Sequence, residues 1–129
     1  MKTITLIKII IVLAVLLVVA LGVSFIFYPN IPVTDFEKSA VMLKVKDDFN
    51  NNNFDGAIKK AETILSGNKK DVSALLAVAS TLAQKGSIEF KEKEYGQKAI
   101  DIANKVLAIE PNNAEAYRII GYANEIMEK

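Results

Sequence analysis

Apolar and polar residues follow two different patterns along this chain. Residues 9–28 form one apolar run without a charged group, whereas residues 34–129 place apolar residues three and four positions apart, between polar ones. The first pattern is typical of a helix that is apolar on every side, and the second is typical of amphipathic helices. The sequence therefore predicts an all-α protein with two different parts.

The apolar run is long enough for a membrane-spanning helix. Twenty residues at a rise of about 1.5 Å per residue extend over roughly 30 Å, the thickness of the hydrocarbon layer of a bilayer. A domain of about 100 residues is too small to surround a helix that is apolar on every side. We therefore predict a single N-terminal transmembrane helix, with an anchor over residues 1–28 that contacts the lipid bilayer through residues 9–28.

The charges beside the run predict its orientation. Lys2 and Lys8 belong to the N-terminal segment, and Asp35 and Glu37 follow it. The positive-inside rule then predicts a single-pass protein of the cell membrane with a cytoplasmic N-terminus and an extracytoplasmic C-terminal domain. Cleavage of a signal peptide after Ala20 is an alternative, but the apolar run continues beyond that site, which favours an uncleaved signal anchor.

Residues 29–33 are predicted to form a short linker. Pro29 and Pro32 favour extended backbone and stop a preceding helix. The remaining residues, 34–129, are predicted to form a separate helical domain.

Five helices are predicted in this domain from its capping and turn residues. Thr34 and Glu37 have the spacing of a capping box, Gly67 suits the end of a helix, and Gly86 is predicted to break one. The predicted helices cover residues 34–50, 54–66, 72–85, 88–109 and 114–127. For the fourth helix, a separate short turn before Tyr95 remains an alternative to one long helix from residue 88.

One spacing of small and apolar residues occurs twice in the domain. Its first copy is Ala57, Ile58, Ala61, Ile64 and Leu65, and its second copy is Ala99, Ile100, Ala103, Val106 and Leu107. A repeated helix pair of this kind predicts a solenoid, in which each hairpin buries its apolar face on the next.

The stretch 99–121 resembles the junction between two tetratricopeptide (TPR) repeats. Small residues stand where two helices touch, a proline follows the second helix, and an aromatic residue, an Ile in place of Leu and a glycine open the next repeat. The matching positions are Ala99, Ala103, Pro111, Tyr117, Ile120 and Gly121. The resemblance implies a TPR-like αα-hairpin solenoid of about 2.5 repeats, five helices in all, that serves protein binding.

The same resemblance implies a groove lined by one face of the first helix of each repeat. The groove residues that it identifies are Met42, Lys46, Leu76, Ser80, Arg118, Tyr122 and Glu125. Leu76 and Ser80 replace the Lys/Asn clamp with which some family members hold a C-terminal carboxylate, so the expected partner is an apolar peptide or helix segment of another protein. The alternative is that this groove is only the inner wall of a small helical bundle.

Composition excludes most catalytic and metal chemistry. The 129 residues include no Cys and no His, which removes the commonest metal ligand and the commonest general base. No phosphate-binding loop, metal motif or nucleophile elbow is present, and acidic pairs such as Asp47-Asp48 lie among lysines, as on a solvated helix face. We therefore predict no enzyme activity, no catalytic residue, no cofactor and no metal site.

Charge also bears on the choice of partner. The chain has 16 Lys and Arg and 15 Asp and Glu, a net charge of +1, and this even balance indicates no nucleic-acid partner.

The last helix is expected either to cap the stack or to leave a face around Ile119, Tyr122 and Ile126 open to another protein.

These patterns favour a membrane-anchored adaptor or scaffold for protein–protein interaction. The alternative is a structural subunit of a filament or envelope assembly, packed through the apolar N-terminal helix, and a homo-oligomer is compatible with both. Residues 5–14 resemble the start of type IV pilins, although Lys8 stands where the pilin glutamate would be.

Overall fold

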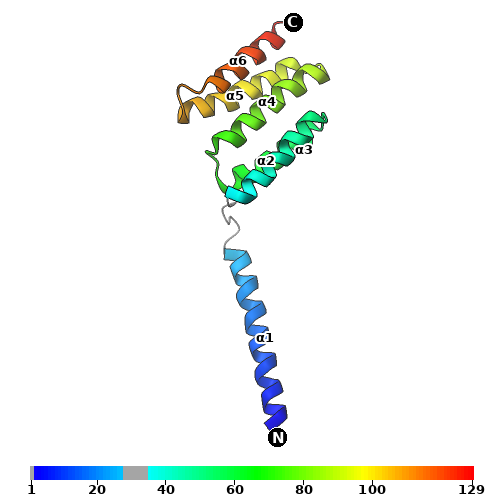
Figure 1. The fold of residues 1–129 in the computed structure, drawn as a ribbon, viewed down its shortest axis with the longest axis vertical. Coiled ribbons are helices and arrows are strands. Elements are labelled where there is room, and N and C mark those ends of the chain that lie inside the picture. The colour runs from blue at the N-terminus through cyan, green and yellow to red at the C-terminus, as the bar shows by residue number, and fades with distance from the viewer. Residues whose placement is uncertain (1, 28–34) are drawn as a thin grey trace. The chain divides into compact units, whose positions relative to one another are not determined.

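The computed structural model describes residues 2–27 and 35–129, and all regular secondary structure in these ranges is helical (Figure 1). Its contacts divide the chain into two compact units, Met1–Ile31 and Pro32–Lys129. The all-α class predicted from the sequence is thus confirmed for the described residues. The predicted linker, residues 29–33, and the predicted cap Thr34 lie outside them.

The first unit contains the helix α1 (Lys2–Phe27). Its large apolar side chains from Ile4 to Leu17 are between 52% and 64% exposed. Because apolar residues occupy consecutive positions rather than one stripe, the side chains between Ile4 and Leu17 are exposed on all sides of the helix.

The predicted transmembrane helix is not supported by this structure, and the prediction is wrong. Within the described part of the chain, we find no helix that combines the length and the apolar character needed to cross a membrane. The predicted single-pass cell-membrane location and its orientation are wrong as well.

The second unit consists of five helices in its described residues, the number predicted. They are α2 (Asp35–Asn50), α3 (Phe54–Gly67), α4 (Val72–Glu89), α5 (Glu92–Ile109) and α6 (Ala114–Met127). The side chains of Asn53, Asp71 and Asn113 cap α3, α4 and α6 by accepting hydrogen bonds from backbone N–H groups three residues ahead.

The turn between α4 and α5 differs from the prediction. Helix α4 continues through Gly86 to Glu89, and Phe90 ends it in a left-handed conformation with φ of 57°. The predicted break at Gly86 and the predicted long helix from residue 88 are therefore wrong, and the alternative of a short turn before Tyr95 is closer. A Cβ atom at Gly86 would lie 3.0 Å from the Cβ of Tyr95, so this glycine lets α5 approach α4 rather than ending the helix.

The five helices form two layers. Helix α4 contacts α2, α3, α5 and α6, whereas the backbones of α3 and α5 do not approach each other in the described structure. Figure 1 shows α6 following the α4–α5 hairpin, which in turn follows α2 and α3. Helices α2, α4 and α6 thus form an inner layer, and α3 and α5 form an outer layer.

Alanines occupy the closest helix contacts. Ala57, Ala61, Ala99 and Ala103, all at positions of the repeated spacing, are completely buried. The first two pack with Val45 and Val78, and the other two belong to a second cluster that joins α4, α5 and α6. Small side chains allow the helix axes to approach, which is why the repeat places alanine there.

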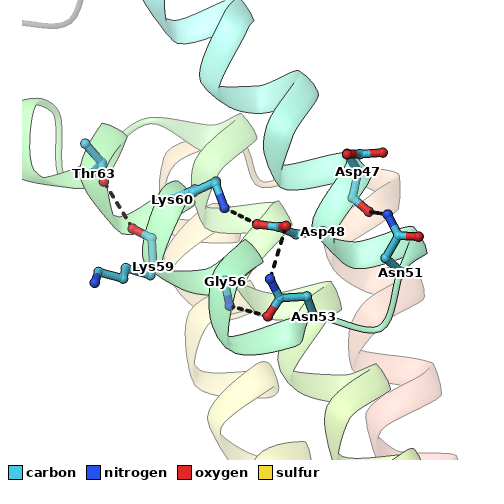
Figure 2. A network of polar contacts seen from close by, with 8 residues as sticks. All are labelled: Asp47, Asp48, Asn51, Asn53, Gly56, Lys59, Lys60 and Thr63. Atoms are coloured by element: carbon cyan, nitrogen blue, oxygen red, sulfur yellow. Dashed lines mark hydrogen bonds and ion pairs between the residues drawn. The ribbon is translucent and has the colours of Figure 1, made fainter.

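Polar contacts around Asp48 fix the turn between α2 and α3 (Figure 2). The Asp48 carboxylate accepts hydrogen bonds from Lys60 of α3 and from the side chain of Asn53 at 3.1 Å. The hydrogen bond from Lys60 favours the charged carboxylate and therefore lowers the pKa of Asp48 below its ordinary value. This network joins the end of one helix to the first two turns of the next.

Candidate binding groove

The inner layer carries an open groove made of two adjoining cavities. The first has a volume of about 190 Å³, and its lining residues are Met42, Val45, Lys46, Phe49, Ala77, Ser80 and Thr81. The second has a volume of about 230 Å³, and its lining residues are Phe49, Ser80, Ala83, Gln84, Arg118, Ile119 and Tyr122. Because Phe49 and Ser80 line both cavities, the groove runs from α2 across α4 to α6.

The first cavity is mainly apolar. Met42, Val45 and Phe49 recur three and four residues apart on α2, so they share the face that turns toward α4. The hydroxyl of buried Thr81 donates to the carbonyl oxygen of Ala77 at 2.6 Å, which satisfies it within its own helix. A ligand side chain in this cavity would therefore meet apolar groups on most sides.

Lys46 is the charged residue of the first cavity. Its side chain is exposed, and it forms no ion pair among the residues that the structure describes. The cavity is thus an apolar hollow with one free cation at its edge.

The second cavity is more polar. The Tyr122 hydroxyl donates to Oε1 of Gln84 at 3.4 Å, across α6 and α4. Arg118 donates to both carboxylate oxygens of Glu115, at 2.8 and 2.5 Å. These hydrogen bonds lower the pKa of Glu115 and raise that of Arg118, because each stabilises the charged form.

The structure brings together most of the groove residues predicted from the sequence. The five that line the two cavities are Met42, Lys46, Ser80, Arg118 and Tyr122. Leu76 instead packs, half-buried, against the core cluster of α4, α5 and α6. Glu125 is exposed and pairs with Lys129 at 3.2 Å, outside both cavities.

Sequence reasoning did not place Phe49 in the groove, although this side chain joins the two cavities. Phe49 follows Met42 by seven residues, which is two helical turns, so both lie on one face. That spacing was the available signal.

The outer face of α6 does not pack as the TPR resemblance implies. Tyr117 is 57% exposed, with its hydroxyl donating to the carbonyl oxygen of Pro111 at 3.0 Å, and a Cβ atom at Gly121 would meet nothing within 4 Å. The corresponding residues of α4, Leu75 and Ala79, are buried. They lie in the core cluster with α5, whereas this face of α6 points away from that cluster.

Of the two alternatives for the last helix, the open face around Ile119, Tyr122 and Ile126 is not the one that the structure shows for Ile119 and Ile126. Both side chains are buried, at 1% and 3% exposure, because they turn toward the preceding helices. The open face of α6 lies instead at Tyr117 and Gly121, each two residues from Ile119 and therefore on roughly the opposite side of the helix.

Lys85 lies outside the groove and is the most enclosed basic side chain of the described chain, at 10% exposure. It pairs with Asp55 of α3 at 2.5 Å and with Glu89 at 3.8 Å, and its ammonium lies 5.0 Å from the ring centre of Tyr95. The hydrogen bond to Asp55 is the main cause of its raised pKa. Lys85 therefore connects α3, α4 and α5, which is a structural role.

The described residues contain no candidate metal site, because no three His, Cys, Asp or Glu side chains among them lie close enough together to hold an ion. No known protein family matches the chain. No curated protein and no solved structure matches it either. The geometry and charges of the groove are therefore the basis on which function is proposed.

Proposed function

We propose that residues 35–129 form a protein-interaction module that binds a segment of another protein in the groove of α2, α4 and α6. The observation that carries this proposal is the continuity of the two cavities through Phe49 and Ser80. A ligand that follows the groove touches three successive helices, which is the arrangement that suits an extended or helical segment.

The form of the groove supports a polypeptide rather than a small molecule as ligand. It consists of two open, joined hollows, whereas a drug-sized ligand is mostly buried in a single concave pocket of roughly 300–1,000 Å³. Volumes of about 190 and 230 Å³ instead suit single side chains of a longer ligand. Such a ligand gains affinity from several small contacts along the groove.

We propose in addition that the hairpins are TPR-like. The completely buried alanines Ala57, Ala61, Ala99 and Ala103 support this, because they occupy equivalent contacts in both hairpins. The exposed positions Tyr117 and Gly121 speak against a full repeat at α6.

Site-specific photo-crosslinking tests the binding function. A photoreactive residue replaces Arg118, an exposed residue of the second cavity, or, as the control, Lys105, which is exposed on α5 of the outer layer. In the cells that make this protein, we expect discrete adducts from position 118 that position 105 does not give, and we expect Ser80→Arg to remove them by filling the groove. Equal adducts from both positions, or adducts that persist with Ser80→Arg, would exclude the groove as the binding site.

A second candidate function is self-assembly through α1. The observation behind it is the exposure of apolar side chains on α1 from Ile4 to Leu17. Contact of so much apolar surface with water is unfavourable, and packing α1 against a second copy would remove it. Sedimentation of the full chain should then reveal one discrete oligomer that Leu13→Lys makes smaller. A broad distribution of aggregate sizes would contradict specific assembly.

A further inference from the structure

We infer that the groove selects a partner segment with one large apolar side chain for the cavity between α2 and α4 and a carboxylate for Lys46. This inference rests on the proposed function and adds the chemistry of the partner. It follows from the charges in the groove, the cost of covering Lys46, and the loose contact between Gln84 and Tyr122.

The first argument is the sign of the groove's charges. Lys46 and Arg118 line the two cavities, and no Asp or Glu does. The whole chain has nearly equal numbers of acidic and basic residues, 15 and 16. The groove is therefore a local exception, and complementary charge on a partner favours association there.

The two cations are not equally available to a partner. Arg118 is already held by both oxygens of Glu115, so a partner carboxylate would have to compete for it. Lys46 is exposed and has no ion-pair partner in the described ranges. Lys46 is therefore the groove cation that can pair with a partner carboxylate without first breaking another ion pair.

The second argument is the cost of covering Lys46. A side chain that fills the cavity of Met42, Val45 and Phe49 also removes water from the neighbouring ammonium. An ammonium that loses water without gaining an acceptor is unfavourable, whereas a partner carboxylate restores a charge-assisted hydrogen bond. A segment that buries an apolar anchor here thus binds best with an acidic residue close to that anchor.

The third argument concerns the second cavity. The Tyr122 hydroxyl and Gln84 are 3.4 Å apart, longer than the roughly 2.7–2.8 Å of a typical O–H···O hydrogen bond. This weak contact is easily exchanged for bonds to the main chain of a bound segment. Gln84 has both donor and acceptor groups, so it accommodates the backbone of such a segment whatever its side chains.

A panel of dye-labelled peptides tests the inference on the full chain, kept in mild detergent because the apolar side chains of α1 are exposed. Each peptide carries one Phe in an otherwise uncharged host and either Glu or Lys one to four residues after it. Fluorescence anisotropy gives the dissociation constants. We expect the best Glu peptide to bind about tenfold more tightly than its Lys counterpart, and Phe→Ala in that peptide to abolish binding.

Charge reversal identifies the responsible residue. Lys46→Glu should reverse the preference between the Glu and Lys peptides, whereas Lys105→Glu, the same charge change on exposed α5, should leave it unchanged. Circular dichroism of both variants checks that the helices are retained. An equal loss of preference in both variants would mean that net charge, not Lys46, selects the peptide, and this would overturn the inference.

The remaining outcomes separate the inference from the proposed function. If peptides bind without charge preference, or if no Glu peptide binds while position 118 still crosslinks to a partner, the inference fails and the proposed function stands. If position 118 gives no specific adducts and no peptide binds, both fail. If Lys46→Glu instead dissociates an oligomer of the chain itself, the occupant is a second copy, and the inference of a separate partner is overturned.

Discussion

Replacing Gly121 by Ala should stabilise the protein. Gly121 lies near the middle of α6, is exposed, and would place a Cβ atom with no other atom within 4 Å. Alanine in an exposed helix interior is favoured over glycine by about 0.8–1.0 kcal/mol, because the backbone of glycine loses more freedom on folding. With no close contact to oppose this gain, we expect nearly all of it in the free energy of unfolding.

The matched control is Gly86→Ala in α4. The helix propensity gained is the same, but the added Cβ atom would lie 3.0 Å from Cβ of Tyr95 and 3.5 Å from the carbonyl oxygen of Lys91. To accommodate it, α5 must move away by a few tenths of an ångström, which loosens the packing of α4 on α5. We therefore expect Gly86→Ala to be less stable than Gly121→Ala, with no net gain over the unchanged protein.

Thermal unfolding followed by circular dichroism at 222 nm measures both variants in the full chain. For a domain of this size, 1 kcal/mol corresponds to a rise in Tm of about 4–8 °C. We expect a rise of this order for Gly121→Ala alone. An unchanged or lower Tm for Gly121→Ala would show that this face of α6 is covered, as in a TPR junction, and would refute the open face described above.

Three further predictions test the capping, the core and the turn of the second unit. Asn113→Ala removes the acceptor that caps α6 through the Ala116 N–H at 2.9 Å, and urea unfolding should show a loss of about 0.5–2 kcal/mol, with Asn113→Ser retaining most of the stability. Ile119→Ala deletes a side chain that is 1% exposed, and the same assay should show a loss of about 2–5 kcal/mol; a loss below 1 kcal/mol would contradict its place in the core. The Asp48 pKa is lowered in the folded protein, so its stabilising effect is complete above the ordinary value of 3.8 and is lost as the pH falls through the lower folded value. Chemical denaturation between pH 5 and pH 2 should therefore show a smaller acid-dependent loss of stability in Lys60→Met than in the unchanged protein, and identical pH profiles would rule out this contribution.

The helices of the second unit were predictable because their boundaries are determined locally. A capping side chain and a turn residue act within a few positions, as Asn53, Asp71 and Asn113 do at the starts of α3, α4 and α6. The role of Gly86 could not be predicted, because it depends on Tyr95 of the next helix. A glycine that ends a helix and a glycine that admits a neighbouring helix look the same in the sequence.

The groove could be predicted only in part for a related reason. The resemblance to TPR repeats placed Met42 and Lys46 of the first helix, and Arg118 and Tyr122 of the last, in the groove, and all four line the cavities. Spacing does not determine how far each helix is rotated about its own axis relative to its neighbours. That rotation turns Leu76 into the core, and it leaves Gly121 open.

The N-terminal prediction was wrong for a different reason. It rested on a count of uncharged residues from residue 9 to residue 28. The described structure contains no helix that meets the requirement for crossing a membrane, so apolar length in the sequence did not by itself establish a span.

The central position of α4 has a consequence for how the groove opens. Helix α4 contacts all four other helices of its unit, whereas α2 and α6 each contact only two of them in the described structure. In a linear stack the end helices open more readily than the middle, so amide hydrogens of α2 and α6 should exchange with solvent through local openings and those of α4 mainly through complete unfolding. Because both end helices supply walls of the groove, each local opening also dismantles part of it. A segment bound along the whole groove should therefore slow exchange in α2 and α6 together, although these two helices do not touch.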